Sequence, residues 1–266
     1  MTNITILGAA DSLPYFFYHH PKNINDIKIV GTLESDINPL LGKDAGLAAG
    51  IDELGVKLTA DFSAAASRAE VLLDFTTPSA AVAHASLAAE QKKAMVIGTT
   101  GMNKNELADI ERSSKKIPIV LAPNMSPGIN LLFSLVSQAA RILADSNIEI
   151  CEIHHKHKKD APSGTALKLA EIAALARNWD LNSVITYGRN GKTGARPEKQ
   201  IGVHAIRAGD IVGEHRVLLA GKAEYLELVH RASSRECFAF GALHAAKWVI
   251  GHNAGLYTMQ DVLELS

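Results

Sequence analysis

The densest group of chemically active side chains lies in residues 152–166, which read EIHHKHKKDAPSGTA. Six consecutive positions, 154 to 159, hold three histidines and three lysines. Because histidine titrates near neutral pH, this segment can transfer protons as well as carry positive charge. The sequence PSGT that follows opens a predicted helix, and the backbone N–H groups at the start of a helix bind anions. We therefore expect a site for a small substrate that carries carboxylates.

Two other interpretations of this basic segment stay open at this point. A run of charged residues is usually a solvated surface. The histidines could also bind zinc, as in a metallohydrolase. Against zinc, His154 and His155 would point to opposite faces if a strand continues through them, and neighbouring ammonium groups repel a cation. We predict no metal site.

The first half of the chain alternates short apolar runs with helical patterns. The runs end at Gly, Thr, Pro or Asn and predict strands at 4–8, 27–33, 71–75, 94–98 and 117–122. Helical spacing predicts helices at 79–92 and 103–114. Continuous apolar strands that alternate with helices are typical of a parallel sheet covered on both faces. The sequence predicts an α/β fold with a Rossmann-type parallel-sheet nucleotide-binding domain.

The pattern changes after Pro123. The sequence predicts a long amphipathic helix at 127–144 and helices at 165–176 and 235–250, with strands at 148–155, 201–207, 211–220 and 225–230. These elements predict an α+β domain with a mostly antiparallel (mixed) sheet. We expect residues 1–126 and 237–266 to form the dinucleotide-binding domain, and residues 127–236 to form the second domain.

The first strand and the second strand have the layout of a dinucleotide fold. The first runs into Gly8, and the second is followed by Glu34, which could accept hydrogen bonds from an adenosine ribose. The next residue, Ser35, gives no positive charge for a 2′-phosphate, which favours NAD over NADP.

The loop after Gly8 departs from a G-x-G-x-x-G pattern. Ala10 and Leu13 stand where glycines are expected, Asp11 brings a negative charge, and Pro14 removes one N–H donor. An ordinary turn, with Asp11 or Ser12 capping the helix, is the alternative interpretation.

Two later loops favour cofactor binding. Gly98-Thr99-Thr100-Gly101 and Ala122-Pro123-Asn124-Met125 each follow a predicted strand. Both should project from the same edge of the sheet as Gly8, near a nicotinamide ring.

Composition excludes several classes of protein. The 266 residues include 27 Lys+Arg and 28 Asp+Glu, a net charge of -1, which argues against a dedicated nucleic-acid binder. Two distant cysteines form no disulfide framework, which indicates a reducing compartment. No apolar stretch reaches the roughly 18 residues that span a bilayer, and the N-terminus is typical of a first strand rather than a signal peptide. We expect a soluble cytoplasmic protein with a small-molecule partner.

Several segments together carry a resemblance to a known family. HHKHKKDAPSGTA is similar to the signature H-H-[RK]-H-K-x-D-A-P-S-G-T-A of dihydrodipicolinate reductases, enzymes of lysine synthesis. Five further segments resemble the same family: DFTTPSA at 74–80, VIGTTG at 96–101, APNMSPGIN at 122–130, IRAGDIVGEH at 206–215 and HRASSRECFAFGA at 230–242. The resemblance covers nearly the whole chain and fails mainly at 9–20.

The resemblance implies a function and a set of site residues. The implied reaction is the NAD(P)H-dependent reduction of 4-hydroxy-tetrahydrodipicolinate to tetrahydrodipicolinate in the diaminopimelate pathway. His154 matches the proton donor/acceptor and Lys158 the second proton donor. His155, Gly164 and Thr165 match substrate contacts. The implied cofactor contacts are Gly8, Ala9, Ala10, Asp11, Ser12, Leu13, Glu34, Gly98, Thr99, Thr100, Ala122, Pro123, Asn124 and Met125. The resemblance also implies a homotetramer joined through the second domain.

One departure from the family keeps an alternative function open. The family loop G-x-x-G-x-M-G is GAADSLP here, so that Asp11 and Pro14 replace glycines. A dicarboxylate-binding or regulatory homologue with weakened cofactor binding is therefore the second hypothesis. The histidines outside 154–157 are predicted to be surface or packing residues.

Overall fold

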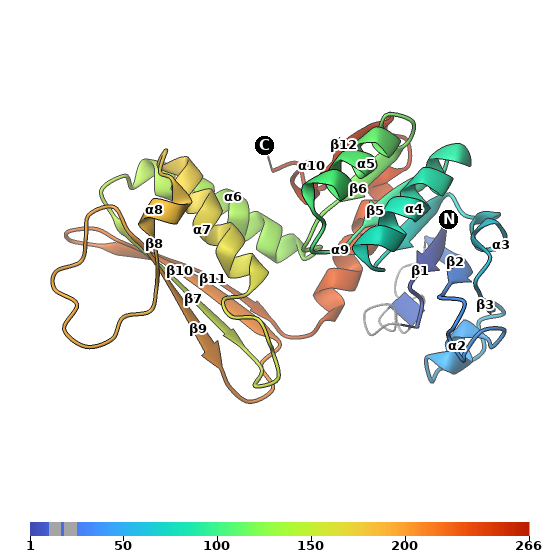
Figure 1. The fold of residues 1–266 in the computed structure, drawn as a ribbon, viewed down its shortest axis with the longest axis horizontal. Coiled ribbons are helices and arrows are strands. Elements are labelled where there is room, and N and C mark those ends of the chain that lie inside the picture. Colours follow the sequence, from blue (N-terminus) through green and yellow to red (C-terminus); the bar gives the residue numbers. More distant parts are fainter. Residues whose placement is uncertain (11–16, 19–25, 266) are drawn as a thin grey trace. The chain divides into compact units, whose positions relative to one another are not determined.

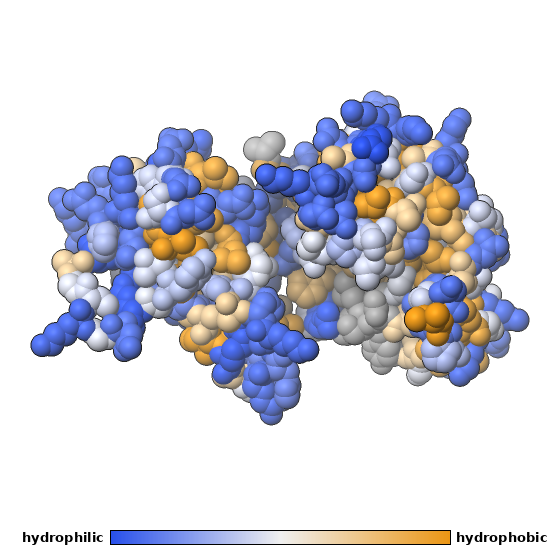
Figure 2. Space-filling view, in the orientation of Figure 1, coloured by the Kyte–Doolittle hydropathy of each residue, from blue (hydrophilic) through white to orange (hydrophobic). Residues whose placement is uncertain are grey.

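The chain forms two compact units in the computed structural model, which describes residues 1–10, 17–18 and 26–265 (Figure 1). Unit 1 comprises Met1–Pro127 and Arg235–Leu265, and unit 2 comprises Gly128–Ser234. Figure 2 shows hydrophilic residues over much of the visible face of each unit, with apolar residues in patches between them. Within the described residues, no helix combines the length and the apolar character needed to span a lipid bilayer.

Unit 1 is built on a parallel sheet of seven strands. The strand order is β12-β6-β5-β4-β1-β2-β3, and every pairing between neighbours is parallel. The strands are β1 (Thr2–Leu7), β2 (Ile27–Leu33), β3 (Leu58–Thr59), β4 (Val71–Asp74), β5 (Ala94–Ile97), β6 (Pro118–Leu121) and β12 (Gly255–Tyr257). The helices are α2 (Ala45–Ala48), α3 (Phe62–Ala66), α4 (Pro78–Glu90), α5 (Lys104–Ser114), α9 (Glu236–Val249) and α10 (Met259–Val262).

The sheet of unit 1 is buried on both faces. Val71 and Leu73 of β4 join a core that contains residues of α9 and α10. Leu72, between them, joins the opposite core, which contains residues of α3, α4 and α5. Because successive side chains of a strand point to opposite faces, strands covered twice are apolar throughout. The predicted Rossmann-type domain is confirmed.

Unit 2 contains a mixed sheet of five strands in the order β11-β10-β7-β9-β8. The strands are β7 (Asn147–His154), β8 (Ile185–Tyr187), β9 (Ile201–Arg207), β10 (Gly213–Ala220) and β11 (Tyr225–Ala232). β10 is antiparallel to β7 and β11, whereas β9 is parallel to β7 and β8. The predicted mixed sheet is confirmed.

Helices cover one face of this second sheet. They are α6 (Pro127–Ile142), α7 (Gly164–Ala176) and α8 (Leu181–Val184). α6 and α7 lie along one face of the sheet (Figure 1), and their apolar residues form one core with alternate residues of β7, β9 and β10. Arg177 at the end of α7 donates hydrogen bonds to the carbonyls of Ala140, Leu143, Ala144 and Ser146. The Ala140 carbonyl lies in the last turn of α6, where carbonyls have no partner within the helix.

The predicted strands and long helices lie where periodicity placed them, with ends that shift by one or two residues. The strands 27–33 and 201–207 have the predicted bounds. The sequence analysis missed the short elements β3, β8, β12, α2, α3, α8 and α10. Elements of two to five residues are too short to show a periodic pattern.

Candidate active site

Glu152 is the buried centre of the polar cluster at the end of β7. It lies on the helix-covered face of the strand and its side chain is 0% exposed. Oε1 accepts hydrogen bonds from the Ser163 N–H at 3.1 Å and from Arg207 Nη2 at 2.7 Å. Oε2 lies 2.8 Å from Arg207 Nη1 and 2.5 Å from His154 Nδ1. Burial alone would raise the pKa of this carboxyl, but the bonds from Arg207 and His154 hold the pKa below its usual range.

His154 is the last residue of β7, and its ring has a hydrogen-bond partner among the described residues at Nδ1 only. Nδ1 contacts Glu152, and the ring meets that of His215 edge to face at 5.2 Å between centroids. Nε2 makes no hydrogen bond to the described residues and is not a buried atom. Burial lowers the pKa of His154, and the Glu152 carboxylate partly opposes that effect. The Lys158 and Arg207 cations lower it further.

The other residues of the basic segment lie in the turn after β7. The Lys158 N–H donates to the His155 carbonyl, and Lys158 Nζ binds Asp160 Oδ1 at 2.8 Å. The rings of His155 and His157 lie 6.3 Å apart. The side chains of this segment therefore do not all point to one place: His154 faces Glu152, and Lys158 faces Asp160.

Helix α7 begins beside the buried carboxylate. Ser163 is its N-cap: its Oγ accepts a hydrogen bond from the Ala166 N–H, and its own N–H binds Glu152. Gly164 and Thr165 are the first two residues of the helix. The start of a helix attracts anions, because its backbone dipoles point their positive ends outward. An anionic ligand at this end of α7 would lie near the basic turn.

The structure adds His215 to this cluster, although the sequence analysis gave it no role beyond packing or surface. His215 is 5% exposed, and its Nε2 lies 3.0 Å from Ser163 Oγ. Burial lowers the pKa of His215 to about 3, so the ring is neutral at neutral pH. Its Nδ1 is buried without a hydrogen-bond partner among the described residues.

Sequence reasoning also missed Glu152 and Arg207, although both lie in segments that it singled out. A signal for Glu152 was available, because residues two apart on a strand share a face and Glu152 precedes His154 by two. Arg207 had no local signal. It pairs with His154 across the β7–β9 ladder, which the sequence alone does not reveal.

At the nucleotide end of unit 1, Gly8 directly follows β1 with a φ of +79°. This positive φ favours glycine, and a Cβ on Gly8 would also stand in tight contact with Thr76 Cγ2, at 3.0 Å. Glu34 follows β2, and its carboxylate accepts hydrogen bonds from the N–H groups of Ala10 and Ser35, each at 2.8 Å. The structure thus brings the start of the loop and the acidic residue together.

A small apolar pocket lies beside this loop. Its cavity volume is about 70 Å³. The lining residues are Ala9, Ala10, Tyr18, Leu40, Ala45, Ala48, Ala49 and Leu58. The Tyr18 hydroxyl donates a hydrogen bond to the Ala9 carbonyl at 3.2 Å, and this bond stabilises the start of the loop. The predicted contacts Asp11, Ser12 and Leu13, and also Pro14, lie outside the described residues.

The two later loops follow β5 and β6 at the same edge of the sheet. The Thr99 hydroxyl is buried and has no hydrogen-bond partner among the described residues. A Cβ on Gly98 would lie 2.3 Å from the Phe75 ring. The Asn124 side chain accepts the Ser126 N–H at 2.9 Å and shapes the second loop.

These residues fit a dinucleotide. They combine a glycine at positive φ, an apolar pocket of suitable position, a carboxylate at the end of β2 and an unpaired buried hydroxyl. Across residues 1–10, 17–18 and 26–265, no group of three or more His, Cys, Asp or Glu is arranged to bind a metal ion.

Comparison with known proteins shows that the chain resembles one family along nearly its whole length. The profile described as "Dihydrodipicolinate reductase, N-terminus" matches residues 3–125, and "Dihydrodipicolinate reductase, C-terminus" matches residues 128–263. The 4-hydroxy-tetrahydrodipicolinate reductase of Anaeromyxobacter dehalogenans (strain 2CP-C) is 44% identical over 266 residues, 100% of this chain and 98% of that protein. The enzyme of the same name from Geotalea daltonii is 42% identical, over 100% of both chains.

Solved structures show the same fold. A dipicolinate-bound dihydrodipicolinate reductase from Paenisporosarcina sp. TG-14 superposes with a TM-score of 0.80 at 24% identity, over 98% of each chain. A myo-inositol dehydrogenase from Corynebacterium glutamicum gives a TM-score of 0.60 at 14% identity, over 100% of this chain and 94% of that one.

Proposed function

The chain belongs to the dihydrodipicolinate reductase family, and from this premise we propose that it reduces 4-hydroxy-tetrahydrodipicolinate to tetrahydrodipicolinate with NAD(P)H, in the diaminopimelate route to lysine. The observation that carries this proposal is the arrangement at the end of β7. His154, whose Nδ1 binds a buried carboxylate, ends β7 directly before the basic turn that leads into the start of α7.

The protein supplies proton transfer and substrate binding, while NAD(P)H supplies the hydride when it is bound. Hydride addition to an unsaturated ring creates a centre that must accept a proton. His154 is the proton donor/acceptor and Lys158 is the second proton donor. His155 and the first residues of α7, Gly164 and Thr165, bind the substrate carboxylates.

The cofactor residues are those at the strand ends of unit 1. Glu34 binds the adenosine ribose, and the loops 98–100 and 122–125 contact the nicotinamide side. NADH is the preferred cofactor, because a 2′-phosphate would meet the negative charge of Glu34 and Ser35 offers no compensating cation. The apolar pocket beside Ala9 supports this placement.

Steady-state assays with enzymatically generated substrate test the function. We expect oxidation of both NADH and NADPH, with the higher kcat/KM for NADH. His154→Ala should lower kcat by about 100-fold or more. A folded wild-type protein that oxidises neither cofactor above background would contradict the proposal. Calorimetric binding of dipicolinate without binding of NADH would instead favour the dicarboxylate-binding homologue that Asp11 and Pro14 suggest.

The enzyme acts in the cytoplasm as a homotetramer joined through the sheet of unit 2. Exposed apolar side chains on the strands and a turn of this sheet support an interface there: Tyr225, Leu226, Val229, Ile206 and Ile211. Light scattering that returns the mass of a single chain would contradict the tetramer.

A further inference from the structure

The partners of Glu152 determine which nitrogen of His154 can react. The Arg207 guanidinium is planar and always charged, and it donates to both carboxylate oxygens. The Ser163 backbone N–H is also a fixed donor. The carboxylate therefore has one orientation, and Oε2 faces His154 Nδ1 at 2.5 Å. An ionised carboxylate can only accept hydrogen bonds, so the proton of this contact belongs to Nδ1.

The opposite edge of the His154 ring is kept open by Gly213 at the start of β10. A Cβ at this position would stand 3.0 Å from Nε2 and 3.3 Å from Cδ2. Nε2 itself has no hydrogen-bond partner among the described residues. The backbone of Gly213 is not in the left-handed region. The glycine is therefore explained by the room that the His154 ring needs, and not by the backbone conformation.

We propose that Glu152 is a positioning residue for His154: held by Arg207 and by the Ser163 N–H, it retains the proton on Nδ1 and leaves Nε2, beside Gly213, as the nitrogen that exchanges a proton with the substrate. The inference rests on the proposed function only in assigning the proton to a substrate. The orientation and tautomer of the ring belong to the protein itself and can be measured without a reaction.

The proton balance of this step involves His154 alone. When the charged ring donates, the Nε2–H bond breaks, its electron pair stays on Nε2, and the proton goes to the substrate. The Nδ1–H bond to Glu152 is unchanged, and the neutral ring regains a proton from solvent. The groups that face the ring are Glu152 on β7, Arg207 on β9, His215 on β10 and Lys158 in the turn. Glu152 is the only anion among these four, so it is the group that favours the charged ring.

The first test measures the ring directly by NMR of protein labelled with ¹⁵N-histidine, with His154→Gln used to assign the resonance. In the neutral ring of the wild type, we expect the proton on Nδ1. Glu152→Gln should weaken this preference and lower the pKa of His154, since the anion is removed. Gly213→Ala should keep the Nδ1–H tautomer. A wild-type ring protonated on Nε2 would overturn the proposal, whether or not the protein is an active reductase.

The second test measures steady-state kinetics on the same proteins. Glu152→Gln should lower kcat by about 10- to 100-fold, as loss of such a supporting group typically does, with little change in KM for NADH. Its kcat–pH profile should move to lower pH, and Glu152→Asp should restore part of the rate. Gly213→Ala should lower kcat with the tautomer unchanged.

Glu149→Gln, on the same strand, is the matched control and should keep the wild-type kcat. If Glu152→Gln fails to fold, the wild-type spectrum and Gly213→Ala still decide the question. A folded Glu152→Gln protein with wild-type kcat and pH profile would overturn the positioning role. An inactive wild type whose His154 has the Nδ1–H tautomer would instead contradict the proposed function alone.

Discussion

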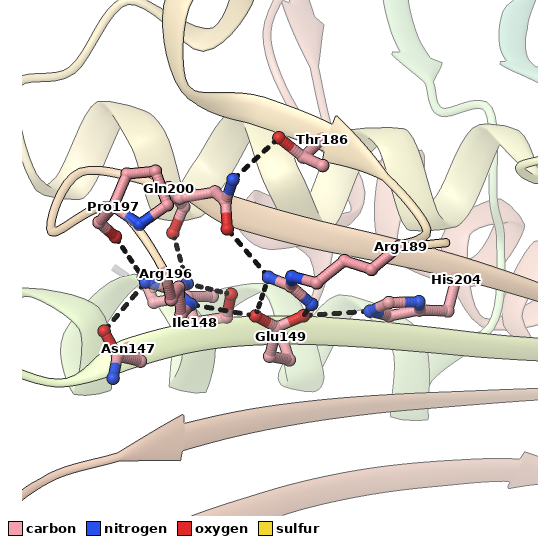
Figure 3. A network of polar contacts seen from close by, with 9 residues as sticks. All are labelled: Asn147, Ile148, Glu149, Thr186, Arg189, Arg196, Pro197, Gln200 and His204. Atoms are coloured by element: carbon pink, nitrogen blue, oxygen red, sulfur yellow. Dashed lines mark hydrogen bonds and ion pairs between the residues drawn. The ribbon is translucent and has the colours of Figure 1, made fainter. Parts of the chain in front are cut away.

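Strand β7 carries two carboxylates, Glu149 and Glu152, that bind the same types of side chain but have different roles. Each binds arginine and histidine side chains. Glu149 accepts from Arg189, Arg196 and His204, at 2.6 to 3.0 Å (Figure 3). Residues three apart on a strand point to opposite faces, so the two clusters lie on opposite sides of the sheet.

The difference between the clusters lies in burial and in what each one secures. The Glu149 side chain is 23% exposed, whereas that of Glu152 is 0% exposed. Arg196 also binds the carbonyls of Ile148, Pro197 and Gln200, so the Glu149 cluster ties the segment 188–200 to the sheet (Figure 3). The Glu152 cluster ends in the His154 imidazole, next to the start of a helix, and Nε2 of this ring has no hydrogen-bond partner in the part of the chain that the structure describes. A Glu–Arg–His group can thus hold a loop against a sheet, as the Glu149 cluster does (the anchor cluster), or orient a reactive side chain, as we propose for the Glu152 cluster.

The largest expected difference between the two clusters is in the free energy of unfolding that is lost when an arginine is removed from each. Arg207→Ala should lower the free energy of unfolding by about 3–5 kcal/mol, because it leaves a fully buried carboxylate without its main cation. Arg189→Ala should cost about 1 kcal/mol or less, since Glu149 keeps Arg196 and His204. Urea unfolding of both variants at pH 7 measures the contrast, and equal losses would show that burial does not distinguish the clusters.

A smaller effect is expected in the stability that Glu149 contributes when the pH falls. Burial alone would raise the pKa of Glu149, but bonds from Arg189, His204 and Arg196 lower it from 4.5 to about 2. A carboxyl whose pKa is depressed in the folded state stabilises the fold above its unfolded pKa, and this stabilisation is lost as the pH falls from about 4.5 towards 2.

Glu149→Gln should therefore lower the free energy of unfolding by about 1–2 kcal/mol at pH 7, after allowance for solvent screening, and the loss should shrink in acid. Denaturant unfolding at a series of pH values measures it. A variant as sensitive to acid as the wild type between pH 4.5 and 2 would contradict a role for Glu149 in this range.

The smallest effect is expected for His204→Ala. The His204 side chain is 34% exposed and shares Glu149 with two arginines, so its loss should change the free energy of unfolding by about 0.5–1 kcal/mol. The kcat should be that of the wild type. A large fall in kcat would show that the anchor cluster also acts on the reaction, and would remove the distinction drawn between the two carboxylates.

The sequence predicted the elements that a periodic pattern can reveal. The site residues that we propose in unit 2, among them His154, Lys158, Gly164 and Thr165, belong to one continuous segment, which the sequence singles out by its histidines and lysines. The supporting residues are remote: Arg207 pairs with His154, and His215 pairs with Glu152, across ladders of β7 with β9 and β10. Such contacts depend on strand register, which is set by the packing of the whole sheet rather than by local residues.

The return of the chain to unit 1 also has a consequence for biosynthesis on the ribosome. The first 127 residues form six of the seven parallel strands, but α9 and β12 come from residues 235–265. Until that last stretch is made, the apolar side chains of β4 and β5 on the face that α9 covers, such as Val71, Leu73 and Val96, lack the cover of that helix. The middle unit, 128–234, is complete before the nucleotide-binding unit that precedes it. The nascent chain therefore presents an exposed sheet face while residues 128–234 are synthesised, a surface for which chaperones have affinity.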